Sequence, residues 1–290
     1  MSVDLEGAVR EALGDPALTV SRVVPTSGGC INNAARVETS SGDVFVKWND
    51  AGPDDLFERE ADGLREMAAA GSGLAIPRVH GAWGAHADRP PLIVMEYLPP
   101  GRTGGAEEAL GRGLAAVHRR TAARYGFGAT TYCGATPQDN TWTATWIEFF
   151  RERRLRALLE LIEETRGLSA GDRRLYEAVL ERLPERLTHD SVPALIHGDL
   201  WSGNVVQTAR GPGLVDPACA YADREMEFGI TTLFGGFGDR FWGAYEEAWP
   251  LPHGWRERNA LYQLYHLLNH YSLFGGHYGP QALEIARRLV

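Results

Sequence analysis

Residues 195–206 read LIHGDLWSGNVV, and residues 213–217 read GLVDP. Together they place an aspartate, an asparagine and a second aspartate in a fixed order, at Asp199, Asn204 and Asp216. Kinase-type phosphoryl transfer uses these groups in this order, with one carboxylate beside the acceptor hydroxyl and with an amide oxygen and a second carboxylate on Mg²⁺. Mg²⁺ prefers such oxygen ligands and takes only one or two carboxylates from a protein. The order predicts a phosphotransferase with Asp199 as catalytic base and Asn204 and Asp216 as metal ligands.

A simpler interpretation exists for each piece of this pattern. HGD at 197–199 fits a turn between two strands, and Asp216 fits the cap of a strand end. The tripeptide alone would favour that interpretation. However, VVQT at 205–208 and GLVD at 213–216 have the composition of two hairpin strands between the candidate ligands. The complete constellation therefore favours the kinase site.

Composition restricts the class of protein. The chain has 290 residues, 44% of them hydrophobic, which suffices for one large domain or two lobes. A net charge of −9 without a basic stripe argues against a nucleic-acid partner. Residues 1–14 lack the basic and apolar regions of a signal peptide, and no apolar run approaches the roughly 18 residues of a membrane span. The three cysteines are far apart and lack metal spacing. We expect a soluble, cytoplasmic protein that contacts no membrane.

The first part of the chain has the pattern of a small sheet that binds a nucleotide. A short helix at 3–13 precedes extended segments, and a glycine-rich segment lies where a loop would cover phosphates: Gly28, Gly29, Cys30, Ile31 and Asn32. The strand VFVK follows, and alternation puts Phe45 and Lys47 on the same strand face. One of these two side chains could then contact the nucleotide base and the other its phosphates.

A helix is predicted at 54–71, and Glu60 on it could pair with Lys47. Glu58 is the competing choice, and a solvated helix face is the plain alternative for both. The apolar strand in PLIVMEYLPPG ends at a Pro-Pro-Gly break, which we take as the boundary between an N-lobe at 1–98 and a C-lobe at 99–290. We expect the N-lobe to bind the nucleotide and the C-lobe to carry the catalytic loop and the substrate. The adenine contact is predicted along the backbone of Met95, Glu96, Tyr97 and Leu98.

The second part has helical periodicity. His118 fits a packed core histidine better than a catalyst, and a helix beginning near Trp142 would put Trp142 and Trp146 on one face. His266 and His270 are spaced like metal ligands, but no third ligand is evident and apolar residues surround them. Core packing is therefore the better interpretation of both histidines.

At this point several segments resemble one known family. LIHGDLWSGNVV, YGFG with GATPQDNTW and WIEFFRERRL, and VDPACAYADREMEF with LFGGF are together similar to the fructosamine kinase (ketosamine-3-kinase) family. The resemblance begins near residue 20. It implies an α+β, two-lobed, protein-kinase-like fold related to aminoglycoside phosphotransferases. It also implies ATP-dependent phosphorylation of the sugar 3-hydroxyl of ketoamines, after which the product decomposes and frees the amine.

Position by position, the resemblance implies the roles of the site residues. Asp199 corresponds to the base, Asn204 and Asp216 to the Mg²⁺ ligands, Lys47 to the phosphate-binding lysine and Glu60 to its partner. Gly28 to Asn32 would form the nucleotide-covering loop, and Trp201 would lie beside the sugar unless it folds into the core. DPA stands where protein kinases have DFG, which favours a small-molecule or protein-bound ketoamine as the acceptor.

Two other functions remain open from the residues. One is a kinase for another small acceptor, such as an aminoglycoside, choline or a free sugar, against which the TPQDNTW and WSGN segments argue. The other is a pseudokinase that only binds nucleotide, against which the complete set of site groups argues. We expect a monomer. Cys30 adds the hypothesis of a redox-linked dimer, with an inert packing cysteine as the equal alternative.

Overall fold

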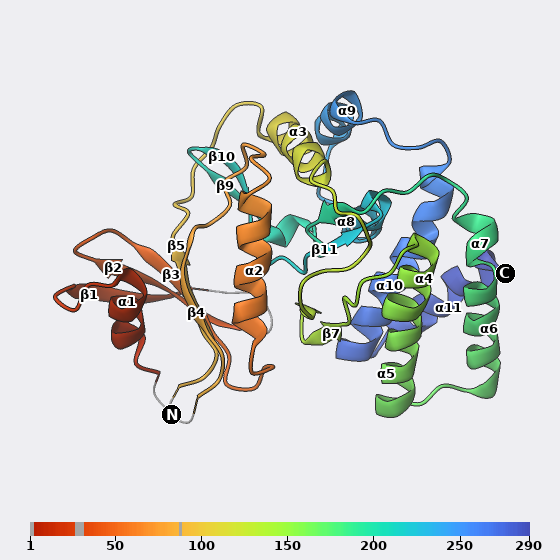
Figure 1. Cartoon of the computed structure of the whole chain (residues 1–290), viewed down its shortest axis with the longest axis horizontal. Coiled ribbons are helices and arrows are strands. Elements are labelled where there is room, and N and C mark those ends of the chain that lie inside the picture. Colours follow the sequence, from red (N-terminus) through yellow and green to blue (C-terminus); the bar gives the residue numbers. More distant parts are fainter. Residues whose placement is uncertain (1–2, 27–31, 87–88) are drawn as a thin grey trace.

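A computed structural model describes residues 3–26, 32–86 and 89–290, and Figure 1 shows a β-rich N-terminal part beside a mostly helical C-terminal part. The N-terminal part contains a five-stranded antiparallel sheet in the order β1-β2-β3-β5-β4. Its strands are β1 (Val20–Thr26), β2 (Asn33–Thr39), β3 (Val44–Trp48), β4 (Val79–Trp83) and β5 (Leu92–Glu96).

Alternation along the strands gives this sheet two apolar faces. Val44 and Val46 of β3 pack with α1 (Leu5–Leu13) on one face, and the intervening Phe45 packs towards α2 (Leu56–Ala68) on the other. The two helices lie on opposite sides of the sheet (Figure 1). Because side chains two positions apart share a face, Lys47 also points to the α2 side. The strand pattern thus directs a lysine towards the helix that carries the candidate glutamate.

The C-terminal part is built around the long helix α10 (Trp255–Phe274), which packs against α5 (Ala157–Thr165), α8 (Glu227–Phe234) and α11 (Tyr278–Leu289). A second contact joins α3 (Ala106–His118) to α9 (Asp239–Ala248), at the top of Figure 1. The remaining helices are α4 (Trp146–Phe150), the π-helix η1 (Arg151–Arg156), α6 (Ala170–Glu181) and α7 (Leu183–Arg186).

Short antiparallel strand pairs frame the segment around Asp199. Strand β8 (Ala194–Ile196) pairs with β11 (Ala220–Ala222), and the predicted hairpin forms from β9 (Val205–Thr208) and β10 (Gly211–Leu214). The other short elements are the β6 (Thr131–Cys133) and β7 (Thr136–Gln138) pair and the 3₁₀ turns η2 (Ser202–Asn204) and η3 (Arg224–Met226). The N–H of Val215 donates to the carbonyl of Asn204 at 3.1 Å. The hairpin therefore brings the residue after β10 back to Asn204, the residue before β9.

The prediction of a helix beginning near Trp142 is wrong. Helix α4 begins at Trp146, because the hydroxyl of Thr145 accepts the N–H of Glu148 at 3.3 Å and caps the first turn. Trp142 lies in the preceding loop, with its ring 6.1 Å from that of Tyr221. Trp146 is buried in the core. The two tryptophans therefore do not share a helix face.

Among the residues that the structure describes, no helix combines the length and the apolar character needed to span a bilayer.

Candidate active site

Lys47 and Glu60 form a buried ion pair between β3 and α2. The Lys47 ammonium lies 2.9 and 2.8 Å from the two carboxylate oxygens of Glu60 and 2.6 Å from Oδ1 of Asp216. Only 2% of the Lys47 side chain is exposed. Burial alone would lower the pKa of Lys47, but the charges of Asp216 and Glu60 outweigh it and raise that pKa above its usual value. The lysine is therefore a fixed cation, and its helix partner is Glu60 rather than Glu58.

Asp199 lies in the loop that follows β8. The side-chain amide of Asn204 donates to the backbone carbonyl of Asp199 at 2.8 Å and to Oδ2 of Asp199 at 3.2 Å. Burial, together with the charges of Asp216 and Glu227, raises the pKa of Asp199 to about 8, although the hydrogen bond from Asn204 acts in the opposite direction. A divalent cation nearby would lower that pKa again, because positive charge favours the carboxylate. The side-chain amide of Asn204 thus fixes the orientation of the candidate base.

Asp216 has an unusual backbone. Its φ of 57° is the one positive value at a non-glycine position in the described part of the chain. Asp and Asn tolerate this left-handed conformation better than other side chains, and such conformations concentrate at functional sites. The conformation places the Asp216 carboxylate within reach of the Lys47 ammonium.

A cavity of about 350 Å³ joins these groups. Lys47, Glu60, Asp199, Asn204 and Asp216 all line it. The rest of the lining is largely aromatic or amide and includes Tyr132, Trp201, Phe234, Asn269, His270, Phe274 and Tyr278, together with smaller residues. Hence one open space contacts a fixed cation, three carboxylates and a group of exposed rings.

The remaining predicted site residues are distributed unevenly. Asn32 lines the cavity, and its Oδ1 accepts from the side chain of Asn49 at 2.8 Å. Trp201 lines it as well and is 40% exposed, so it does not fold into the core. Gly28, Gly29, Cys30 and Ile31 lie outside the described residues. Residues outside the cavity lining include Phe45, Met95, Glu96, Tyr97 and Leu98, so the adenine contact stays a prediction.

His270 departs from the sequence-based interpretation. His266 is buried as expected, but His270 is only half-buried and lines the cavity, so the prediction of core packing is wrong for it. The spacing of four residues correctly predicted that His266 and His270 lie on one helix. Which face of α10 meets solvent depends on how α8 and α11 pack against it, and the spacing does not show this.

Glu227 binds the backbone of the two residues that precede Asp199. It was not identified as a site residue from the sequence. Its buried carboxylate accepts the N–H of His197 at 2.5 Å and that of Gly198 at 3.0 Å. His118 is a buried histidine, as predicted, and lies 3.4 Å from the same carboxylate. Gly198 must be glycine here, because its φ is 82° and a Cβ would lie 2.2 Å from the carbonyl oxygen of Ala218. The signal available in the sequence was one acidic residue at the start of a helix that carries no other charge.

We expect Glu227→Gln to lower stability by about 1–3 kcal/mol, because an amide cannot accept on both sides and leaves a buried N–H unpaired. The loop would then hold Asp199 less accurately, and kcat should fall by roughly tenfold to a hundredfold. Thermal unfolding and steady-state kinetics measure the two effects, with exposed Glu247→Gln as the control. Wild-type kcat and stability in Glu227→Gln would contradict this role.

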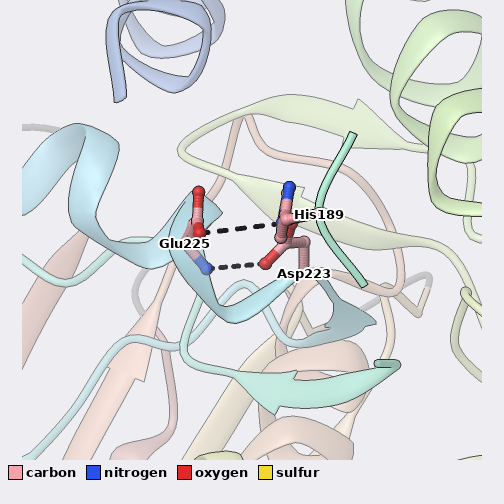
Figure 2. Close-up of side chains that lie close together, drawn as sticks. All are labelled: His189, Asp223 and Glu225. Carbon is pink, nitrogen blue, oxygen red and sulfur yellow. Dashed lines mark hydrogen bonds and ion pairs between the residues drawn. The ribbon is translucent and has the colours of Figure 1, made fainter. Parts of the chain in front are cut away.

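A second polar cluster lies away from the cavity. Figure 2 shows His189, Asp223 and Glu225 close together, with Nε2 of His189 at 2.5 Å from Asp223 and 3.6 Å from Glu225. These three residues have the composition of a metal site. However, the Arg258 guanidinium already takes both oxygens of Glu225, at 2.8 and 2.6 Å. A cation is thus present, and we interpret the cluster as an ion-pair network.

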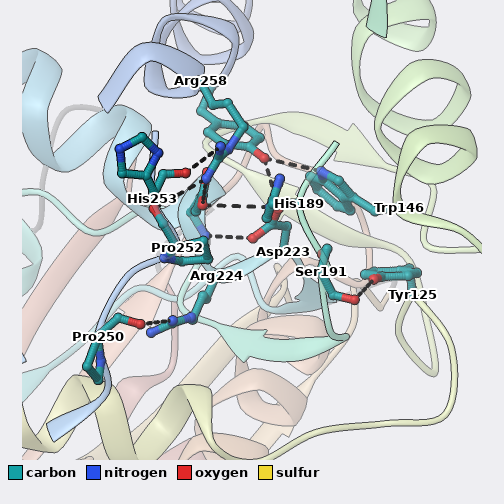
Figure 3. A network of polar contacts seen from close by, with 12 residues as sticks. Tyr125, Trp146, His189, Ser191, Asp223, Arg224, Pro250, Pro252, His253 and Arg258 are labelled. Atoms are coloured by element: carbon teal, nitrogen blue, oxygen red, sulfur yellow. Dashed lines mark hydrogen bonds and ion pairs between the residues drawn. The ribbon is translucent and has the colours of Figure 1, made fainter. Parts of the chain in front are cut away.

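The network ties the segment before β8 to α10 and to the core. Tyr262 donates to Asp223 at 3.0 Å and accepts from the indole N–H of Trp146 at 3.2 Å. Tyr125 donates to the carbonyl of Ser191 at 2.8 Å, and Figure 3 shows this contact in the same region as His189 and Asp223. The network therefore supports the strand that leads into the Asp199 loop.

We expect the contribution of His189 to stability to depend on pH. Burial alone would lower the pKa of His189, but the hydrogen bond and charge of Asp223, with the charge of Glu225, raise it. The contribution is complete below the unfolded value of about 6.5 and is lost as the pH rises through the folded pKa. His189→Gln should therefore cost more stability at pH 6 than at pH 9 in urea unfolding.

His253→Gln is the matched control, because His253 is exposed and only its backbone carbonyl accepts from Arg258. An equal loss of stability in His189→Gln at both pH values would show that His189 contributes no charge.

Comparison with known proteins agrees with this geometry. The family model described as Fructosamine kinase matches residues 4–290. The chain is 40% identical over 277 residues to the chloroplastic protein-ribulosamine 3-kinase of Oryza sativa subsp. indica, covering 93% of this chain and 79% of that protein. It is 35% identical to a protein of Enterococcus faecium described as a probable ketoamine kinase, covering 96% of this chain and 98% of that one.

Solved structures confirm the predicted protein-kinase-like fold. A Thermobifida fusca protein described as a fructosamine-3-kinase has a TM-score of 0.87 and 35% identity, covering 99% of this chain and 98% of that one. An aminoglycoside phosphotransferase in complex with ADP and hygromycin B has a TM-score of 0.64 at 15% identity, over 99% and 98% of the two chains, which supports the fold alone. With a family match over nearly its whole length and relatives at 35–40% identity, this chain belongs to the fructosamine kinase family.

Proposed function

We propose that this protein transfers the γ-phosphoryl group of ATP to the 3-hydroxyl of a ketoamine. The observation that carries the proposal is one cavity lined both by Lys47, Asp199, Asn204 and Asp216 and by exposed aromatic rings. The names of the relatives, a ribulosamine 3-kinase and a ketoamine kinase, support the substrate class. ATP as donor is supported by the family.

The donor set fits Mg²⁺. The Asn204 amide nitrogen is engaged with Asp199, which leaves its side-chain oxygen as a ligand, and the Asp216 carboxylate is partly exposed in the cavity. These hard oxygen donors are few, as Mg²⁺ prefers. When bound, Mg²⁺ would neutralise charge on the phosphate oxygens of the nucleotide. Asn204 and Asp216 are therefore the residues that we assign to hold it.

The chain's own residues supply position and charge. Lys47, held by Glu60, supplies a fixed positive charge beside the place that we assign to the phosphates. Asp199 orients the acceptor hydroxyl and takes its proton, which contributes on the order of 10² to 10⁴ in rate. Phosphoryl transfer has a loose transition state, so positioning and electrostatics account for most of the catalysis.

We further propose that the nucleotide binds mainly to residues 1–98, and that the backbone of Met95 to Leu98 contacts adenine. Asn32 and the preceding glycine-rich segment would cover the phosphates. Residues 99–290 would carry the acceptor, with Trp201 against the sugar, and a cytoplasmic monomer is the form that we expect. Sugar C–H groups stack on aromatic faces, and the exposed Trp201 ring offers one inside the cavity.

The proposal is tested by ADP release from ATP and Mg²⁺ across a panel of acceptors. We expect turnover with fructosamines, ribulosamines or erythrulosamines, and none with an aminoglycoside, choline or free fructose. Higher turnover with one of the latter three would assign a different small-molecule kinase. ATP binding without transfer to any ketoamine would indicate a pseudokinase.

A further inference from the structure

Four rings from three helices meet in the lining of the cavity. Phe234 is the last residue of α8, His270 and Phe274 lie in the last turns of α10, and Tyr278 is the first residue of α11. His270 is central, with its ring centroid 5.0 Å from that of Phe234, 5.7 Å from Phe274 and 5.1 Å from Tyr278. We name these four residues the aromatic wall. All four line the cavity that also contacts Asp199.

Two side chains of the aromatic wall are exposed to solvent. Phe274 is 53% exposed and Phe234 is 42% exposed. Together with Trp201 they make up three of the six large hydrophobic side chains that are exposed within the described residues, and all three line this cavity. Exposed apolar surface that gathers around one hollow marks a binding surface. The wall therefore has the character of a ligand contact rather than of leftover surface.

The electrostatics of the wall suit a cation. Nδ1 of His270 lies 2.8 Å from the carbonyl oxygen of His266, and because a carbonyl only accepts, Nδ1 carries the proton and Nε2 is left as an acceptor. Burial lowers the pKa of His270, which keeps the ring neutral at physiological pH. Among the described residues that line the cavity, the fixed cation is Lys47, already bonded to two carboxylates. A positive ligand therefore meets ring faces and an acceptor, without a repelling charge on the wall.

A ketoamine differs from a free ketose by a nitrogen on C1, which is protonated and positive at neutral pH. With the 3-hydroxyl at Asp199, this nitrogen and its substituent must lie further along the same cavity. Aromatic faces attract ammonium groups, and aromatic cages recognise substituted ammonium ligands in this way. We propose that the aromatic wall binds the protonated nitrogen of the ketoamine and its substituent, and so selects ketoamines over free sugars.

This inference rests on the proposed function, and it names the part of the site that recognises the amine. Trp201 would contact the sugar of a ketoamine and of a free ketose, so it contributes equally to the binding of both. The wall contributes only where a positive charge is present. The two contributions can therefore be separated by substrates that differ in charge and share the sugar.

The test uses a ketoamine with a protonated tertiary nitrogen and its neutral ether analogue, in which oxygen replaces that nitrogen. Wild-type enzyme should have the higher kcat/KM for the charged substrate. Phe274→Leu keeps bulk but removes the ring face, and it should reduce this preference by about two- to fivefold through KM. Phe234→Leu combined with Phe274→Leu should reduce it further, whereas Phe274→Tyr should retain it.

Phe237→Leu is the matched control, since its ring packs on Phe241 at 4.9 Å and does not line the cavity. Trp201→Leu should raise KM for both substrates equally. Thermal unfolding checks that each variant is folded. We expect the Phe274 variants to be folded, because the Phe274 side chain is exposed. An unchanged preference in the double variant, or no preference in the wild type, would overturn the inference and leave the proposed kinase activity intact. If wild type phosphorylates no ketoamine, the proposed function itself fails.

Discussion

Asp199→Ala should lower kcat for the ketoamine by at least about a hundredfold, because the acceptor hydroxyl loses the group that orients it and takes its proton. The affinity for ATP should stay the same or increase slightly, since a negative charge near the phosphates is removed. Steady-state kinetics and isothermal titration with ATP measure the two quantities separately. A loss of kcat with ATP binding retained is the signature of a base rather than of a folding residue.

Asp199→Asn is the companion variant. It keeps the size of the side chain and an oxygen that can accept from the Asn204 amide, which now lies 3.2 Å from Oδ2. It should be as inactive as the alanine variant, because an amide does not take the proton. More than about a tenth of wild-type kcat in either variant would contradict the assignment of Asp199 as base.

Asp216→Asn has the second large expected effect. The carboxylate is 2.6 Å from the Lys47 ammonium and is the only charged ligand that we assign to Mg²⁺. We expect the affinity for ATP in the presence of Mg²⁺ to fall by about tenfold or more, as for the loss of a charge-assisted contact. Without Mg²⁺ the affinity should not fall, because the lost charge repelled the phosphates.

Asparagine is the substitution of choice at this position. The φ of 57° at Asp216 is tolerated by Asn, whereas Ala would add backbone strain that confuses the result. Titration of ATP with and without Mg²⁺ is the measurement, and exposed Asp239→Asn is the control for general loss of charge. Equal affinity for Mg²⁺·ATP in Asp216→Asn and wild type would exclude Asp216 as a ligand.

Much of the fold followed from local patterns. Alternation along β3 put Phe45 and Lys47 on one strand face, and the kinase pattern offered Glu60 as the partner of Lys47, with Glu58 as the alternative. The hairpin between β9 and β10 followed from the composition of its two short strands. These predictions succeeded because each depends on neighbours in sequence or on one strand face.

The residues that sequence reasoning missed depend on tertiary packing. Phe234, His270 and Tyr278 belong to three different helices, and only the packing of α8 and α11 against α10 brings their rings together. In sequence, His270 among leucines and tyrosines fits a core position equally well. Glu227 was missed for the same reason, since its hydrogen-bond donors are the backbone groups of His197 and Gly198, some 30 residues earlier.

The error at Trp142 has a local cause. A spacing of four residues was compatible with a helix that starts at either tryptophan, and Thr145 is the better N-cap because its hydroxyl reaches the N–H of Glu148. Capping outweighed the apolar spacing, and the helix begins at the second tryptophan.

The position of the transferred phosphate tests the central claim most directly. The protein would be incubated with ATP, Mg²⁺ and a ribulosamine or a fructosamine, and the product would be examined by mass spectrometry and by phosphorus–proton correlation NMR. We predict a single phosphate on oxygen 3 of the sugar, absent with Asp199→Ala, followed by release of the free amine as the product decomposes. A phosphate on another hydroxyl, or no phosphorylated ketoamine at all, would contradict the account.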